Sequence, residues 1–69
     1  MKSQELKGLI IAKDKKQLVL AEAMGLSLSR LNAKINETSG AEFTQSEIAF
    51  IRDRYKLSNT QVNDIFFSR

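Results

Sequence analysis

The stretch AEAMGLSLSRLNAKIN, Ala21 to Asn36, decides the fold because it contains both the end of one helix and the start of the next. Gly25 stands where the upstream helix must stop, since glycine adopts the positive φ of a left-handed cap at little cost. Ser27 follows as an N-cap, and Leu26 and Leu31 have the spacing of a hydrophobic staple. The stretch therefore predicts two helices joined by a tight turn, over about residues 15–24 and 28–36.

Helix signals continue on both sides of this stretch. Apolar residues at helical spacing predict a first helix over about residues 3–13, and Asp14 and Gln17 have the spacing of a capping box for the second. Two further capping boxes, TQSE at 44–47 and SNTQ at 58–61, predict helices over about 45–56 and 59–67. The polar segment ETSGAE, residues 37–42, which comes before the first of these two helices, is predicted to be a surface loop.

The length and composition fit one all-α domain, residues 1–69, with a compact five-helix architecture. A chain of 69 residues is too short for two domains, and the absence of proline with only three glycines favours helices. The predicted core consists of the residues on the apolar stripes: Leu6, Leu9, Ile10, Leu18, Ala21, Met24, Leu26, Leu31, Ile35, Phe43, Ile48, Ile51, Tyr55, Leu57, Val62, Ile65 and Phe66.

The residue types that are missing limit the function. Without histidine or cysteine the usual nucleophiles, general bases and metal ligands are absent, so we expect no enzyme, no metal and no cofactor. The N-terminal MKSQELK lacks a signal-peptide core, and no apolar stretch is long enough to span a bilayer. We therefore expect a cytoplasmic protein that does not bind membranes.

The net charge of +3 is unevenly distributed along the chain. Residues 1–36 hold seven basic and three acidic residues, a net charge of +4, whereas residues 37–69 hold four basic and five acidic residues, a net charge of −1. The basic half contains the stretch AEAMGLSLSRLNAKIN. This placement suits a polyanionic partner such as double-stranded DNA, although a solvated lysine-rich surface is the alternative.

The pattern from Gln17 to Ile35 resembles the helix-turn-helix of the lambda-repressor-like superfamily. In that motif the small Ala21 lets the second helix cross closely, Gly25 makes the turn and Leu26 plugs the space between the helices. QLVLAEAMGLSLSRLNAKIN, AEFTQSEI and the terminal IFF together resemble the small Cro-type regulators of temperate phages of Gram-positive bacteria. This resemblance implies a five-helix repressor fold and a role in a lysis–lysogeny switch.

Carried over residue by residue, the resemblance implies a DNA-binding surface. It assigns phosphate or backbone contacts to Gln17 and Asn36, and base pairing with adenine and guanine to Asn32 and Arg30. The complete predicted surface is Gln17, Ser27, Ser29, Arg30, Asn32, Ala33, Lys34 and Asn36, with supporting basic charge from Lys15 and Lys16. Structural roles compete with these: a cap for Gln17 and Ser27, solvated charge for Arg30 and Lys34, and a helix stop for Asn36.

A helical wheel places Leu28 next to this surface. At about 100° per residue, Leu28, Leu31 and Ile35 share a sector of about 60°, whereas Ser29, Asn32, Ala33 and Asn36 lie outside it. We therefore predict that Leu28 belongs to the packing edge of the helix and borders the outward face.

Two aromatic residues fall off the predicted stripes. Phe50 lies about 160° from the sector of Ile48, Ile51 and Tyr55, and Phe66 and Phe67 cannot both face one small core. Phe50 and Phe67, together with Leu28, are predicted to form a partner or homodimer surface. The alternative is that both phenylalanines fill the core.

Two functions remain open at this point. The first is a sequence-specific DNA-binding transcriptional regulator, Cro-like or repressor-like, that acts as a dimer on paired half-sites. The second is a modulator of repression that binds a partner phage repressor protein. The helix predicted over residues 28–36 has short polar residues and the apolar Leu28, and these favour the second function more than a typical helix-turn-helix sequence does.

Overall fold

The computed structural model describes residues 1–68, which form five α-helices, two short helical turns and no strand. In chain order the elements are α1 (Ser3–Asp14), α2 (Gln17–Met24), α3 (Leu28–Asn36), the 3₁₀ turn η1 (Thr38–Gly40), α4 (Gln45–Tyr55), α5 (Asn59–Val62) and the π-helical turn η2 (Asn63–Phe67). The predicted all-α class and its five helices are confirmed.

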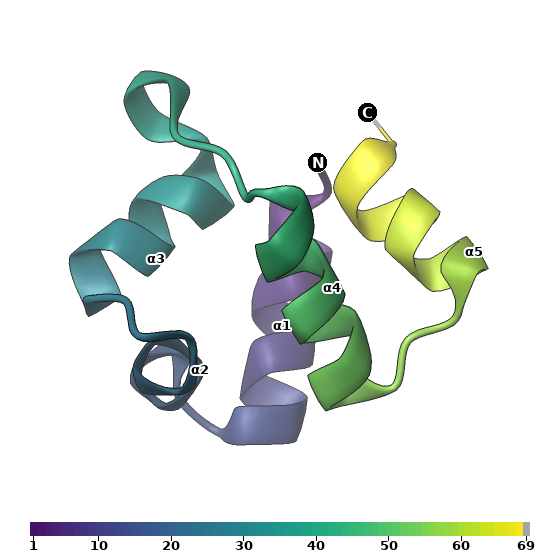
Figure 1. Ribbon diagram of the computed structural model, residues 1–69, viewed down its shortest axis with the longest axis horizontal. Coiled ribbons are helices and arrows are strands. Elements are labelled where there is room, and N and C mark those ends of the chain that lie inside the picture. Colours follow the sequence, from purple (N-terminus) through teal and green to yellow (C-terminus); the bar gives the residue numbers. More distant parts are fainter. Residues whose placement is uncertain (69) are drawn as a thin grey trace.

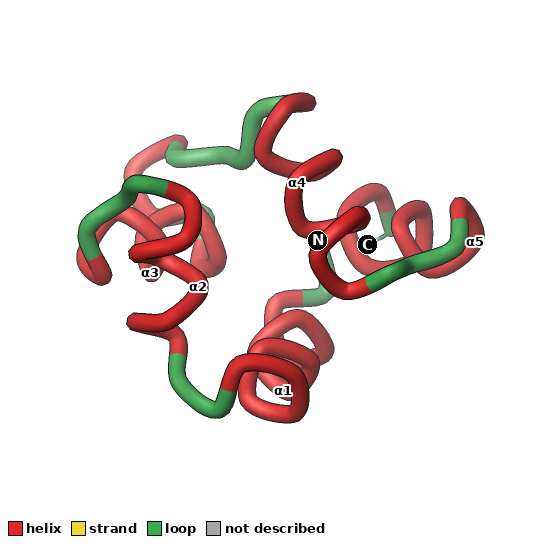
Figure 2. The backbone as a smooth tube through the Cα atoms, turned by 60° about the horizontal axis from the view of Figure 1, so that its bottom comes forward, coloured by secondary structure: helices red, strands yellow, loops and turns green. Residues whose placement is uncertain are grey.

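The helices surround a single core. α2 and α3 lie on one side and α5 on the other, with α1 and α4 between them, as Figures 1 and 2 show from two directions. The two ends of the chain lie close together, because the Lys2 N–H donates to the Ile65 carbonyl oxygen at 2.8 Å and Lys2 Nζ pairs with Asp64 at 2.7 Å. No helix within residues 1–68 has both the length and the hydropathy that crossing a membrane requires.

Three helix starts follow the capping patterns in the sequence. Ser27 has the extended backbone of an N-cap, and its side chain accepts a hydrogen bond from the first turn of α3. Thr44 with Glu47 and Ser58 with Gln61 form complete capping boxes, in which each side chain bonds the other residue's backbone N–H. These caps fix where α3, α4 and α5 begin.

The start of α2 differs from the prediction. Asp14 and Gln17 form no capping box: α2 begins at Gln17, and its N-cap Lys16 makes no side-chain cap bond. Lys15 has φ +73° and its N–H donates to the Ile11 carbonyl oxygen at 3.1 Å, so this residue ends α1 and cannot belong to α2. Asp14 is instead the last residue of α1, and its carboxylate contacts α4 rather than the start of α2.

The core contains one contiguous cluster of buried apolar side chains from all five helices and η2. Its members are Leu6, Ile10, Leu20, Ala21, Leu31, Ile35, Ile48, Ile51, Tyr55, Val62, Ile65 and Phe66. Leu9, Met24, Phe43 and Leu57 pack against the cluster and are half-buried. Most of the predicted core is therefore confirmed.

Leu18 is the clearest error in the predicted core. It is 46% exposed, whereas Leu20, which the prediction omitted, is fully buried. The actual stripe of α2 runs through Gln17, Leu20, Ala21 and Met24, at spacings of three, one and three residues. Because QLVLAEAM is apolar at nearly every position, its periodicity does not single out one face.

The carboxylate of Asp14 joins the ends of α1 and α4. Arg54 donates to it through Nε at 3.1 Å and through Nη2 at 2.8 Å, and the Tyr55 hydroxyl donates to the same group. The hydrogen bond from Arg54, helped by that from Tyr55, holds the pKa of the Asp14 carboxyl below its ordinary value although burial opposes the shift. The burial of Tyr55, together with the Asp14 carboxylate, raises the pKa of the tyrosine hydroxyl.

The end of the chain is helical as predicted, but its last turn is wider. α5 ends at Val62, and Asn63–Phe67 continue as a π-helical turn. This turn buries the consecutive residues Ile65 and Phe66 and leaves Phe67 exposed. Phe66 meets Phe43 edge-on, with ring centroids 5.8 Å apart.

The variant Asp14→Asn is expected to lower the free energy of unfolding by about 1–3 kcal/mol at neutral pH, because Arg54 and Tyr55 lose a charged acceptor. Since the pKa of Asp14 is lowered in the folded state, its contribution is present above the ordinary value of 3.8 and is lost as the pH falls through the folded value. Urea unfolding should therefore show a smaller stability loss for the variant than for the wild type between about pH 5 and pH 2.

Asp53→Asn is the matched control for this experiment. Within residues 1–68, Asp53 pairs only with Arg52, and both side chains are exposed, so the change should stay within about 0.5 kcal/mol. If the free energy of unfolding falls by the same amount with pH in the wild type and in Asp14→Asn, the Asp14 contacts add nothing to stability.

Candidate nucleic-acid interface

The turn between α2 and α3 is closed by backbone hydrogen bonds. Gly25 has φ +72°, and its N–H donates to the Glu22 carbonyl oxygen at 3.1 Å. The Leu26 N–H donates to the Ala21 carbonyl oxygen at 2.9 Å, which completes a Schellman motif. A side chain at residue 25 would be strained at this φ. The turn thus sets a fixed angle between the two helices.

α3 is fixed at both ends. At its start the Arg30 N–H donates to the Ser27 hydroxyl at 3.1 Å. Near its end the Ser3 hydroxyl donates to the Ile35 carbonyl oxygen at 2.6 Å and thereby ties α3 to the start of α1. Leu31 and Ile35 are fully buried between these points. The opposite face of a rigidly seated helix is therefore available to a ligand.

The predicted contact residues do not all share that outward face. Ser29, Arg30 and Asn36 are exposed on α3, whereas Asn32 and Ala33 are half-buried. Ser27 is exposed but its hydroxyl serves as the N-cap of α3. Gln17 is half-buried as the first residue of α2, and Lys15 and Lys16 are exposed just before it. The structure thus presents an α3 face of small polar groups and one guanidinium.

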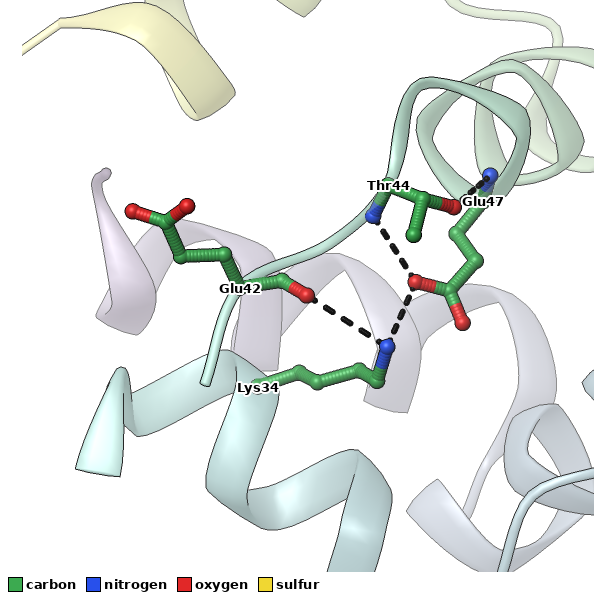
Figure 3. A network of polar contacts seen from close by, with 4 residues as sticks. All are labelled: Lys34, Glu42, Thr44 and Glu47. Carbon is green, nitrogen blue, oxygen red and sulfur yellow. Dashed lines mark hydrogen bonds and ion pairs between the residues drawn. The ribbon is translucent and has the colours of Figure 1, made fainter. Parts of the chain in front are cut away.

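Lys34 is not an exposed cation, which corrects the sequence prediction. It is 8% exposed, and its Nζ donates to Glu47 Oε1 at 2.7 Å and to the Glu42 carbonyl oxygen at 3.3 Å (Figure 3). The same Glu47 oxygen accepts the Thr44 N–H at 2.8 Å. Lys34 therefore connects α3 to the start of α4 and leaves the set of candidate DNA contacts.

The charges in this network fit each other. Burial would raise the pKa of the Glu47 carboxyl, but hydrogen bonds from Lys34 and Thr44 and the charge of Lys34 together outweigh it and lower that pKa. Glu47 was found in the sequence only as a capping residue. Its second role was missed because Lys34 lies thirteen residues earlier in the chain, beyond the reach of a local pattern.

Leu28 is also placed differently from the prediction. It is 39% exposed, so it is not part of the packing edge despite its angular position beside Leu31 and Ile35. Helical side chains point toward the helix N-terminus, and Leu28 is the first residue of α3. Its side chain therefore projects past the end of the helix, where the core no longer covers it.

Phe50 and Phe67 do not form one surface. Both are exposed, by 38% and 56%, but they line different hollows. Phe50 lies with Ala23 and Met24 beside α2, and it does not fill the core, as the alternative required. Phe67 lies with Phe43 and Phe66 near the end of the chain. The predicted joint surface is therefore two separate ones.

The cations without an ion pair in the helix-turn-helix region lie just before α2 and on α3. Within residues 1–68, Lys15, Lys16 and Arg30 make no ion pair, whereas Lys34 is neutralised by Glu47. In the same described part of the chain, no group of three or more acidic side chains is placed to hold a metal ion. The arrangement suits recognition of a polyanion by hydrogen bonds and charge.

No protein-family model matches the chain, and no significant match was found among curated proteins or solved structures.

The variant Lys34→Met tests the structural role of the buried lysine. It keeps most of the aliphatic stem but leaves Glu47 without its cation, so the free energy of unfolding should fall by about 1–3 kcal/mol in urea titrations. Arg30→Met, the same type of change on the exposed face, should alter stability by less than about 0.5 kcal/mol. Equal effects of the two changes would contradict the distinction between a structural Lys34 and a free Arg30.

Proposed function

We propose that the chain is a sequence-specific DNA-binding transcriptional regulator in which α2 and α3 form a helix-turn-helix. The observation that carries the proposal is the outward face of α3, where Ser29, Arg30 and Asn36 are exposed on a helix whose other side is locked into the core. A helix of nine residues is about 13 Å long, and its outward face can enter a major groove about 12 Å wide.

The proposed contacts divide between bases and phosphates. Arg30 is the candidate for guanine O6 and N7, and the half-buried Asn32 for adenine, each contributing about 1–3 kcal/mol of discrimination. Gln17 and the free backbone N–H groups of α2 face the phosphate backbone, with Lys15 and Lys16 beside them. Asn36 provides a further backbone contact at the end of α3, while Ser29 and Ala33 lie on the proposed groove-facing surface.

The proposed mode of action needs two copies of the chain. The molecule measures 28 × 25 × 21 Å, and successive major-groove faces on one side of DNA are about 34 Å apart. One copy reads one half-site, so a pseudo-palindromic operator requires a homodimer. The resemblance of the sequence to Cro-type phage regulators supports a place in a lysis–lysogeny switch in the cytoplasm of a bacterial host.

A titration with operator-like DNA at several salt concentrations tests this proposal. It compares the wild type with the variants Lys16→Ala and Lys56→Ala. Binding to operator-like DNA should weaken as salt rises, and Lys16→Ala should reduce the slope of log K against log salt by about 1 for the lost phosphate contact. Lys56→Ala, at the end of α4, should leave the slope unchanged. No binding at low salt, or binding that salt does not weaken, would refute the proposal.

A second candidate function is favoured by the exposure of Leu28. A leucine that projects from the first turn of α3 presents an apolar group where a base-reading helix usually carries a polar one. In this alternative the chain is a modulator of repression, and α3 binds a partner phage repressor protein instead of DNA alone.

Co-purification with a partner repressor tests the alternative. Leu28→Ala should abolish or weaken the complex at least tenfold, because the leucine would be buried in the interface. Leu18→Ala is the matched control, since Leu18 is similarly exposed on α2. A complex that survives Leu28→Ala would place the protein contact elsewhere.

A further inference from the structure

Phe67 is the most exposed of the large apolar side chains in residues 1–68, at 56%. It has no place in the core because the π-helical turn already directs Ile65 and Phe66 inward. Phe66 itself packs edge-on against Phe43. The fold therefore holds Phe67 at the surface.

An open hollow of about 230 Å³ lies beside Phe67. Its apolar lining comes from Met1, Phe43, Ile48, Phe66 and Phe67 itself. A protein cavity of about 150 Å³ accepts a benzene molecule, so this hollow has room for one phenyl ring. An exposed phenyl group and a hollow of matching size thus occur on the same face of one chain.

We propose that this face is the contact between two copies of the chain, with Phe67 of each copy entering the hollow of the other. A projecting group and a complementary hollow on one surface are satisfied together by a two-fold axis, because each copy then gives and receives the same contact. The proposal is independent of Phe50, which lines a different hollow.

The charges around the hollow permit two identical faces to meet. Its lining residues include two with a negative charge, Glu37 and Glu42, and two with a positive charge, the N-terminal Met1 and Lys34. The amino group of Met1 pairs with Glu37 at 3.6 Å. Lys34 pairs with Glu47, and the Glu42 carboxylate points away from Lys34 (Figure 3). A balanced surface avoids the like-charge repulsion that would separate two copies, and it offers a polyanion no excess of positive charge.

The position of the hollow connects this contact with DNA recognition, and that connection rests on the proposed function. Lys34 and Glu37 place the hollow at the C-terminal end of α3, whereas Ser29 and Arg30 do not line it. A two-fold axis there brings the C-terminal ends of the two α3 helices toward each other and leaves their first turns free. The face with Ser29 and Arg30 then stays accessible in each copy, so that each can meet its own half-site.

Sedimentation velocity from about 10 µM to about 1 mM tests the contact with wild type, Phe67→Ser and Phe50→Ser. A small interface predicts weak, concentration-dependent dimers. Phe67→Ser should raise the dimer dissociation constant at least tenfold, and Phe50→Ser, the matched exposed aromatic, should leave it within twofold. Urea unfolding of the three proteins checks that both variants fold.

A wild type that stays monomeric over the whole range, or dimers that Phe67→Ser does not weaken, would overturn the proposal. A DNA-binding measurement distinguishes this contact from the proposed function. The Phe67→Ser variant should bind DNA with a single half-site as the wild type does, but it should lose cooperative binding to DNA with two half-sites. Phe67-dependent dimers without any DNA binding would refute the DNA proposal and support this contact. DNA binding without Phe67-dependent association would support the DNA proposal and refute this contact.

Discussion

The ammonium group of Lys34 lies on the buried side of α3, and the structure around it depends on neutralising that charge. An unpaired buried charge is too costly to retain, so a carboxylate and a carbonyl oxygen must come to it. Glu47 and Glu42 supply them from the start of α4 and the preceding loop. Because Glu47 also caps α4 through Thr44, one ion pair fixes both the start of α4 and its distance from α3.

This constraint also determines which part of α3 is available to a ligand. Leu31, Lys34 and Ile35 all face inward, so the rest of α3 offers a ligand short side chains, Arg30 and the exposed Leu28. The cations that remain for a polyanion are concentrated at the start of α2. Such a surface can hold DNA through its phosphates with limited direct reading of bases, and the exposed Leu28 leaves room for a protein ligand at the same helix.

The sequence predicted the elements whose signals are local. Ser27, Thr44 and Ser58 mark three helix starts because each cap is formed within four residues of the chain. The Asp14 pattern failed because a distant partner, Arg54, takes its carboxylate. The uniformly apolar α2 could not show whether Leu18 or Leu20 faces the core.

The candidate site was less predictable than the fold. The composition of the outward face of α3 follows from the helical wheel, since Ser29 and Asn36 lie opposite the buried stripe. The burial of Lys34 depends on Glu47, which lies thirteen positions away in the chain. The exposure of Leu28 depends on its place as the first residue of α3, where the core no longer covers the helix. A local pattern contains neither fact. Phe50 and Phe67 likewise looked equivalent in the sequence and lie on different surfaces in three dimensions.

The most direct test is a two-dimensional ¹⁵N–¹H NMR titration of the chain with an operator-like duplex of about 20 base pairs. If the helix-turn-helix proposal is correct, the largest shift changes will fall on residues 15–17 and on Ser27 to Asn36. Residues 59–62 of α5, on the other side of the molecule from α2 and α3 (Figure 1), will remain unchanged. Changes confined to residues outside α2 and α3, or none at the lowest salt, would contradict it.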